Sequence, residues 1–135
     1  MLKDRTADKK REFLINTFIG TGIGILVTFL ILLIIAAASV LLDLQNSLMS
    51  PLASVSLAIG SYIGAYISAK RNKERGLING LINSGIVFLI LSVVSAILSQ
   101  QGVTIISLLH LIITTLSGAI GGIIGVNSAN KRKII

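Results

Sequence analysis

The sequence predicts an all-α integral membrane protein whose four transmembrane helices form two tandem helical hairpins, with both termini cytoplasmic. Three observations lead to this fold class. The chain is 53% hydrophobic and only 13% charged, its mean hydropathy is +0.93, and its basic residues fall in three blocks separated by two long apolar tracts. A soluble chain of 135 residues has a large surface for its volume and needs many more polar residues to cover it.

The lengths of the apolar tracts predict the number of membrane crossings. A helix rises about 1.5 Å per residue, so about 20 apolar residues cross a hydrocarbon core of about 30 Å. Each tract is long enough for two crossings and has one polar break, at residues 43–51 and 99–102. In the first break, Ser50 is expected to cap the next helix and Pro51 to occupy its first position, where no amide donor is needed. The predicted spans are 14–42, 51–69, 77–98 and 103–126.

The positions of the basic residues predict the topology, because cytoplasmic segments of membrane proteins carry the excess of Lys and Arg. All twelve lie in the N-terminal, middle and C-terminal segments, and neither polar break contains one. The residues expected to determine the topology are Lys10, Arg11, Lys70, Arg71, Lys73, Arg75, Lys131, Arg132 and Lys133. The chain then divides into a basic cytoplasmic segment (1–13), a first transmembrane hairpin (14–69), a basic cytoplasmic loop (70–76), a second hairpin (77–126) and a basic cytoplasmic tail (127–135).

The composition also bears on partners and chemistry. The net charge of +7 is explained by these three segments, which are expected to attract anionic lipid headgroups beside the bilayer. Nucleic acid is not an expected partner, because the chain lacks an aromatic surface on which bases could stack. The absence of cysteine excludes disulfides, thiolate metal sites and cysteine nucleophiles. The first apolar stretch is too long for the core of a cleaved signal peptide, so we expect this helix to be retained.

Small residues spaced four apart occur in every predicted span, toward its cytoplasmic end. Residues four apart share one face of a helix, and small residues let helix backbones approach closely inside lipid, where the hydrophobic effect gives no drive for association. The glycines expected to pack the helices are Gly20, Gly24, Gly60, Gly64, Gly76, Gly80, Gly121 and Gly125.

The two halves of the chain share sequence features that predict an internal repeat. "GSYIGAYISAKR" at 60–71 and "GGIIGVNSANKR" at 121–132 both read Gly-x-x-x-Gly, five residues, then Lys-Arg. A hairpin that crosses twice and is duplicated gives two copies of the same orientation. We therefore expect Gly64 and Gly125 to make equivalent backbone contacts in the two hairpins.

The second half of the chain also resembles a known family. "KERGLINGLINSGIVFLIL" at 73–91 and "SGAIGGIIGVN" at 117–127 resemble a bacterial family of small four-helix membrane proteins of unknown function, common in low-GC Gram-positive bacteria. The resemblance covers the second hairpin well and the first more loosely. It implies four spans and a location in the plasma membrane, and it implies no activity.

A candidate intramembrane polar site consists of Asn79, Asn83, His110 and Asn127. Ionisable residues inside membranes are functional candidates by default. For His110 we favour a neutral imidazole bonded to a serine or a backbone carbonyl, because a proton relay needs a carboxylate and only Asp43 lies outside the cytoplasmic segments. Asn79 and Asn83 lie one turn apart and are expected to bond across helices; the alternative is a polar substrate site.

No arrangement of residues typical of catalysis is present. The spans contain no paired carboxylates, no histidine cluster and no serine near both a base and an orienting acid, so we expect neither an enzyme nor a cofactor or metal. The predicted function is that of a non-enzymatic accessory or assembly subunit for a membrane-protein partner. The alternative is a small homo-oligomeric channel or transporter, which broken helices and charges near the bilayer midplane would favour.

Overall fold

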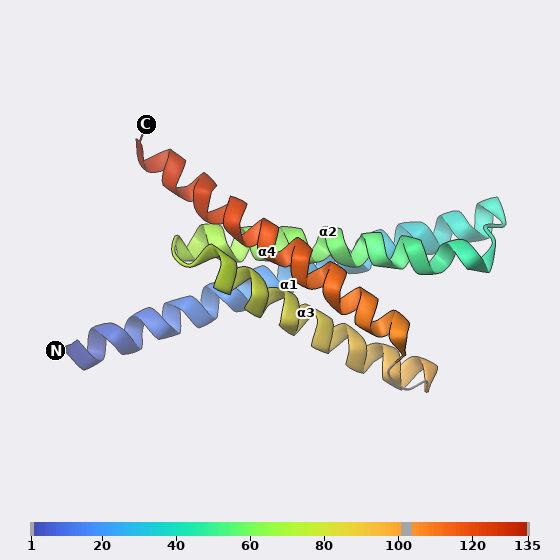
Figure 1. The fold of residues 1–135 in the computed structure, drawn as a ribbon, viewed down its shortest axis with the longest axis horizontal. Helices are drawn as coiled ribbons and strands as arrows, with labels where there is room; N and C mark the ends of the chain where they lie inside the picture. Colours follow the sequence, from blue (N-terminus) through green and yellow to red (C-terminus); the bar gives the residue numbers. More distant parts are fainter. Residues whose placement is uncertain (1, 101–103, 135) are drawn as a thin grey trace.

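The fold, a computed structural model that describes residues 2–100 and 104–134, contains four helices within these ranges. They are α1 (Leu2–Leu42), α2 (Asn46–Asn72), α3 (Gly76–Ser99) and α4 (Ile105–Ile134). Consecutive helices run in opposite directions, so the start of α1, the α2–α3 connection and the end of α4 lie at one end of the molecule (Figure 1). Each helix is long and apolar enough to cross a membrane. The predicted all-α fold with four long apolar helices is confirmed.

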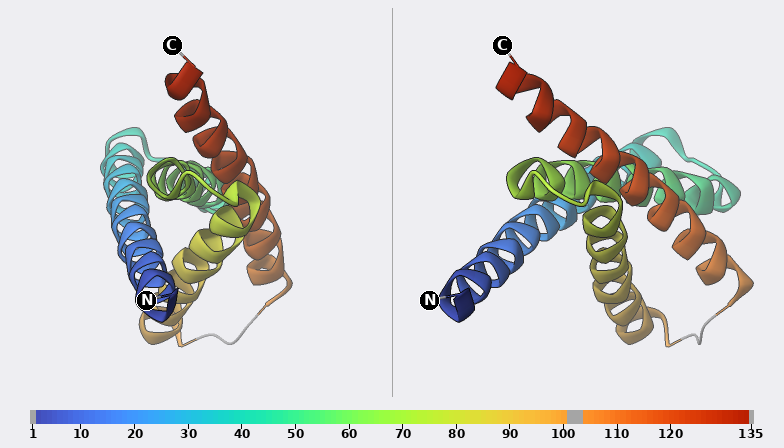
Figure 2. Two further views of the ribbon diagram at one scale, coloured as in Figure 1. Left: turned by 90° about the vertical axis from the view of Figure 1, so that its left-hand side faces the viewer. Right: turned by 60° about the vertical axis from the view of Figure 1, so that its left-hand side comes forward.

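Helix α2 occupies the centre of the arrangement. It packs against each of the other three helices, whereas α1 and α4 do not touch within the described residues. Figure 2 shows α2 between α1 and α4. In the apolar 18-residue stretch of α2 that could span a membrane, 39% of the residues are buried, compared with 6% in the corresponding stretch of α1. The contacts of α2 therefore hold the other three helices together.

The first and last helices continue past the predicted spans into the basic segments. α1 includes the basic residues that precede residue 14, and α4 runs through its basic residues to Ile134. Neither basic segment contains the Gly or Pro that would most readily end a helix. The backbone therefore stays helical where the sequence changes from apolar to basic residues.

The predicted start of the second span at Ser50 and Pro51 is wrong. Helix α2 begins at Asn46, its N-cap residue Gln45 makes no side-chain capping bond, and Pro51 lies inside the helix. Pro51 has no amide hydrogen, so the bond that another residue would donate from this position to the Ser47 carbonyl, in the first turn, is absent. Pro51 therefore removes one backbone bond, and α2 nevertheless continues without a break to Asn72.

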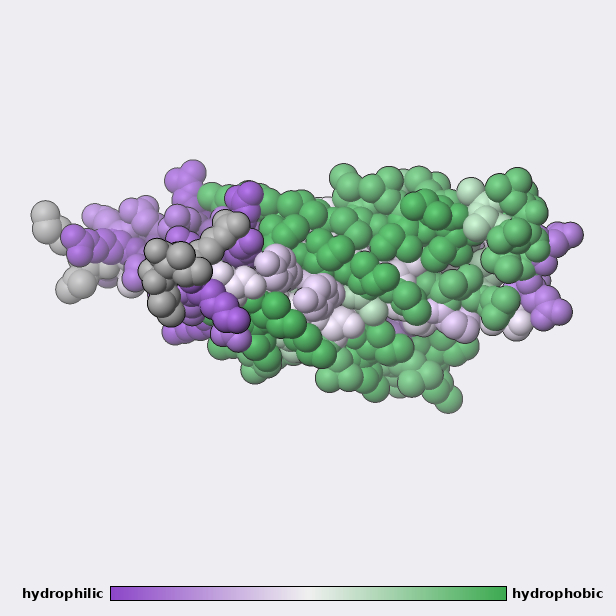
Figure 3. Space-filling view, turned by 90° about the horizontal axis from the view of Figure 1, so that it is seen from above, coloured by the Kyte–Doolittle hydropathy of each residue, from purple (hydrophilic) through white to green (hydrophobic). Residues whose placement is uncertain are grey.

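The interior contains small and polar side chains. The buried hydrophobic residues among those described are Ala65, Ala69, Val87 and Ala129, and the buried polar ones are Thr17, Thr21, Thr28, Ser56, Ser61, Ser68, Asn79, Asn83, Ser84 and Thr114. Large Leu, Ile and Phe side chains lie outside, where they form an apolar band between hydrophilic ends (Figure 3). This distribution suits a protein surrounded by lipid, which covers large apolar side chains while small ones let the helices approach.

Glycines bring the backbones of α1 and α2 into contact. A methyl group on Gly20 would lie 2.7 Å from the carbonyl oxygen of Gly64, and one on Gly24 would lie 2.9 Å from that of Gly60. These distances are well inside the separation of about 3.5–4.0 Å at which non-bonded atoms attract each other. Neither position therefore has room for a side chain.

A second glycine contact joins α3 and α4. The carbonyl oxygens of Gly118 and Gly122 lie where side chains on Gly80 and Gly76, respectively, would have to fit. A methyl group on Gly118 would likewise lie 2.8 Å from the carbonyl oxygen of Gly80. The two helices thus meet backbone to backbone, as α1 and α2 do.

Helix α4 uses a different pair of glycines to contact α2. Gly121 and Gly125 lie against the backbone carbonyls of Tyr62 and Tyr66. The glycine-rich stretch at 118–125 therefore contains two series of glycines, one facing α3 and the other facing α2. The expected equivalence of Gly64 and Gly125 is wrong for this reason.

Replacement of Gly64 by alanine tests the α1–α2 contact. The new methyl group would lie 2.9 Å from both the Gly20 carbonyl oxygen and Asn83 Oδ1. We expect overpacking to cost about 1–3 kcal/mol and to lower the midpoint of thermal aggregation in mild detergent by roughly 4 °C or more.

The control is Gly22→Ala in α1, where a methyl group would meet nothing within 4 Å. Both substitutions favour the helical conformation by about 1 kcal/mol, so the difference between the two midpoints reports the effect of the contact alone. Gly22→Ala should leave the midpoint unchanged or raise it. Equal midpoints for the two variants would contradict the packing role of Gly64.

Candidate functional site

Three asparagine side chains form a chain of hydrogen bonds across α1, α2 and α3, at the end of the molecule that carries the α2–α3 connection. Asn16 Nδ2 donates to Asn72 Oδ1 at 3.0 Å, and Asn72 Nδ2 donates to Asn79 Oδ1 at 3.0 Å. Asn79 Nδ2 then donates to the backbone carbonyl of Glu74 at 2.8 Å. We call these three side chains and that carbonyl the amide ladder. Because a carbonyl only accepts, it sets the direction of every bond in the ladder.

The amide ladder holds a tight connection between α2 and α3. Lys73 and Arg75 adopt left-handed backbone conformations, with φ of 60° and 50°. Each costs about 1 kcal/mol or more for a residue with a side chain. The ladder bonds to the residues on either side of Lys73 and the bond from the Lys73 amide to the Ala69 carbonyl, at 2.9 Å, offset this cost. The connection is consequently fixed relative to α1.

A second group of polar side chains lies deeper in the same three-helix junction. Asn83 Nδ2 donates to Thr21 Oγ1 at 3.0 Å, and the Thr21 hydroxyl donates to the Thr17 carbonyl at 2.8 Å. Asn83 Oδ1 and Ser68 Oγ are buried and have no hydrogen-bond partner among the described residues. Asn83 thus joins α3 to α1 through its nitrogen, while its oxygen accepts no hydrogen bond from the described residues.

His110 lies in α4, away from both groups. Its Nε2 is buried and accepts or donates no hydrogen bond within the part of the chain that the structure describes. The bond to a serine or a carbonyl that we expected is not made by this atom. The hydrogen bonds nearby involve Thr114, whose hydroxyl donates to the His110 carbonyl and whose carbonyl accepts from the Ser61 hydroxyl at 2.9 Å, linking α4 to α2.

The four residues of the predicted polar site do not come together. Asn79 and Asn83 share the face of α3 that meets α1 and α2, but they bond to separate partners. His110 lies on α4, and Asn127, also on α4, is exposed. Sequence analysis missed Asn72, because we considered its segment only for its charge.

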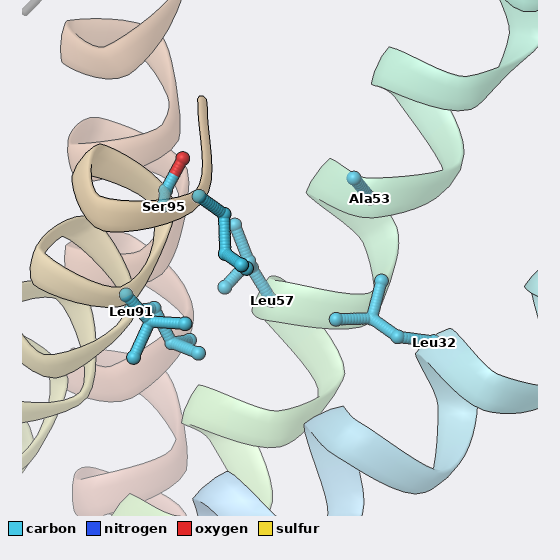
Figure 4. A pocket seen from close by; sticks show the side chains of 7 residues that line it. Leu32, Ala53, Leu57, Leu91 and Ser95 are labelled. Carbon is cyan, nitrogen blue, oxygen red and sulfur yellow. The ribbon is translucent and has the colours of Figure 1, made fainter. Parts of the chain in front are cut away.

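An apolar groove lies between α1, α2 and α3 in the half of the molecule far from the α2–α3 connection. It has a volume of about 370 Å³ and is lined by Leu32, Ala53, Leu57, Leu91, Val94, Ser95 and Leu98. Figure 4 shows Leu57 of α2 and Leu91 of α3 directed into the space between their helices. Such a lining suits hydrocarbon or another apolar helix rather than a polar substrate.

A polar pocket lies at the opposite end, between α1 and the α2–α3 connection. It has a volume of about 260 Å³ and is lined by Lys9, Glu12, Phe13, Asn16, Arg71, Asn72, Lys73 and Glu74. Asn16 and Asn72 of the amide ladder are part of its wall. The described residues contain no group of three or more His, Cys, Asp or Glu side chains able to hold a metal ion.

Four long apolar helices, joined through small residues and carrying their basic groups at one end, define a multi-pass membrane protein. The chain belongs to the DUF3792 family of proteins of unknown function, whose model matches residues 14–125. The family of unknown function that the sequence resembles is thereby confirmed. No curated protein and no solved structure matches the chain.

The amide ladder generates a stability prediction at Asn72. Asn72→Ala leaves Oδ1 of the fully buried Asn79 without a donor. An unsatisfied buried group costs about 1–3 kcal/mol, so we expect a lower midpoint of thermal aggregation in mild detergent.

The matched control is Asn130→Ala, at an exposed position of α4. It removes the same atoms without breaking the ladder, so its midpoint should equal that of the unsubstituted protein. If Asn72→Ala and Asn130→Ala have the same midpoint, the ladder does not contribute to the stability of the protein.

Proposed function

We propose that the protein is a non-enzymatic accessory or assembly subunit that binds another membrane protein through its helices. The observation that carries this proposal is the chemistry of the interior. The buried polar side chains of the junction mostly bond to one another or to the backbone, and the hollow between the apolar parts of the helices is itself apolar. A pathway for a polar solute needs polar groups that remain free along its length.

The surface of α1 supports the same proposal. Within the described residues this helix contacts only α2 and α3. It leaves large side chains outside, including Phe18 at 70% and Phe29 at 62% exposure. Helices associate in lipid through complementary packing rather than hydrophobic drive. An uncovered helix beside an apolar groove offers a shaped surface to a helical partner.

The second candidate is a small homo-oligomeric channel or transporter. It is favoured by the buried oxygen atoms Asn83 Oδ1 and Ser68 Oγ, which have no partner among the described residues. Such acceptors could serve a solute if several copies arranged their junctions around a common cavity. The apolar lining of the groove and the hydrogen bond that joins Asn83 to Thr21 lead us to prefer the accessory subunit.

Isolation from native membranes in a mild detergent tests the proposal. We expect a different membrane protein to co-purify in fixed ratio and to be lost when large side chains are introduced into the apolar groove, as in Ala53→Phe. The control, Ile105→Phe, changes a position of α4 that is 78% exposed and lies outside both the groove and α1. Solute flux into liposomes that contain only this protein would instead favour the channel or transporter.

We further propose a bacterial plasma-membrane location, with both termini and the α2–α3 connection in the cytoplasm and two parallel hairpins, α1–α2 and α3–α4. Support comes from the distribution of charge. The basic residues outside the apolar band gather at one end, and the opposite end has none among the residues at 43–45 and 99–104. The positive-inside rule assigns the basic end to the cytoplasm, where anionic headgroups would be adjacent partners.

Single cysteines test this topology, since the chain contains no native cysteine. Asn46→Cys and Thr104→Cys should react with an impermeant maleimide added to intact cells. Glu74→Cys and Asn130→Cys should react only after the membrane is opened. All four side chains are exposed, so labelling should report access rather than burial. Labelling of Glu74→Cys from outside would overturn the orientation.

A further inference from the structure

Three cationic side chains from separate segments line the polar pocket. Lys9 comes from α1, Arg71 from the last turn of α2 and Lys73 from the α2–α3 connection. Across the residues that the structure describes, none of the three has an ion-pair partner. Their positive charge is therefore available to a ligand.

The full charge of the pocket limits which anion fits. Glu12 and Glu74 also line it, so its cations exceed its carboxylates by one. A phosphodiester carries a single negative charge and balances this excess. A phosphate monoester carries about −1.5 to −2 and would meet more repulsion from the two carboxylates.

The amide ladder prepares the pocket for an anion. Asn16 and Asn72 line the pocket, and their bonds fix the backbone that carries Arg71 and Lys73. A site ordered before binding loses less entropy when the ligand arrives. Each amide nitrogen carries two hydrogens and the ladder uses one, so the second is available to an oxygen of the ligand. Arginine adds a planar pair of donors that matches a phosphate group.

Apolar surface begins directly beside the pocket. Phe13 forms part of its lining, and the next two residues of α1, Leu14 and Ile15, are 55% and 49% exposed. The pocket thus lies where the polar residues of α1 give way to exposed apolar ones. A ligand that places an anion in the pocket can extend hydrocarbon chains along α1.

We propose that this pocket binds the phosphodiester headgroup of a membrane phospholipid, with Lys9, Arg71 and Lys73 contacting the phosphate. This proposal rests on the proposed membrane location, and it assigns the headgroup contact to one specific pocket. It is independent of the accessory role, because it requires no other protein.

Native mass spectrometry of the purified full-length protein in non-ionic detergent tests the site. The probes are phosphatidylglycerol and a diacylglycerol with the same acyl chains, which lacks the phosphate. We expect the unsubstituted protein to retain phosphatidylglycerol in preference to diacylglycerol. The double variant Arg71→Gln/Lys73→Gln should bind phosphatidylglycerol at least about tenfold more weakly, as expected from the loss of charge-assisted bonds.

The control is Lys3→Gln/Arg5→Gln, which removes the same charge from exposed positions of α1 outside the pocket. It should keep its affinity for phosphatidylglycerol. Lys9→Gln, on a different helix from the double variant, should weaken binding without touching the α2–α3 connection. This variant keeps the test decisive if the double variant unfolds.

Three results would overturn the proposal. Equal weakening in the pocket and control variants would indicate attraction by diffuse charge alone. Equal retention of diacylglycerol and phosphatidylglycerol would remove the role of the phosphate. Displacement of the lipid by millimolar inorganic phosphate would assign the pocket to a soluble anion. None of these outcomes depends on whether a partner protein co-purifies.

Discussion

Direct contact between helix backbones is the constraint on which the rest of this structure depends. In lipid, apolar surface gains nothing by leaving its surroundings, so helices are held together by close packing and by hydrogen bonds. Gly24 against Gly60, and Gly80 against Gly118, allow the close approach that such packing needs. This approach leaves little volume between the helices, which explains why, apart from Val87, the buried side chains are alanine, serine, threonine and asparagine.

The close approach also determines what the polar residues do. Asparagine side chains can bridge helices only when the backbones are near, as they are where Asn83 reaches Thr21 and where Asn72 bonds to both Asn16 and Asn79. The same bonds hold the left-handed connection after α2 and the walls of the polar pocket. Amide side chains thus connect the packed helices to the charged pocket at their end.

Local sequence signals were reliable for the helices and less reliable for their ends. Proline is common at a first helical position, and Ser50 before Pro51 therefore predicted a helix start that the structure places at Asn46. Pro51 removes one backbone bond in the second turn, and the helix nevertheless extends back through it to Asn46, which the local sequence did not predict. Of the polar site, the shared face of Asn79 and Asn83 was predictable from their spacing. Their partners on α1 and α2 were not, because those depend on how the helices cross.

The sequence by itself determined four long apolar helices, the grouping of positive charge at one end and the spacing of small residues along the helix faces. These properties follow from composition and from the period of a helix, both of which are local. Only the tertiary structure decided that Gly118 and Gly122 face α3 while Gly121 and Gly125 face α2, and that Asn72 completes the amide ladder. The physical reason is that lipid makes all apolar faces nearly equivalent, so the choice of partner depends on atomic fit between helices.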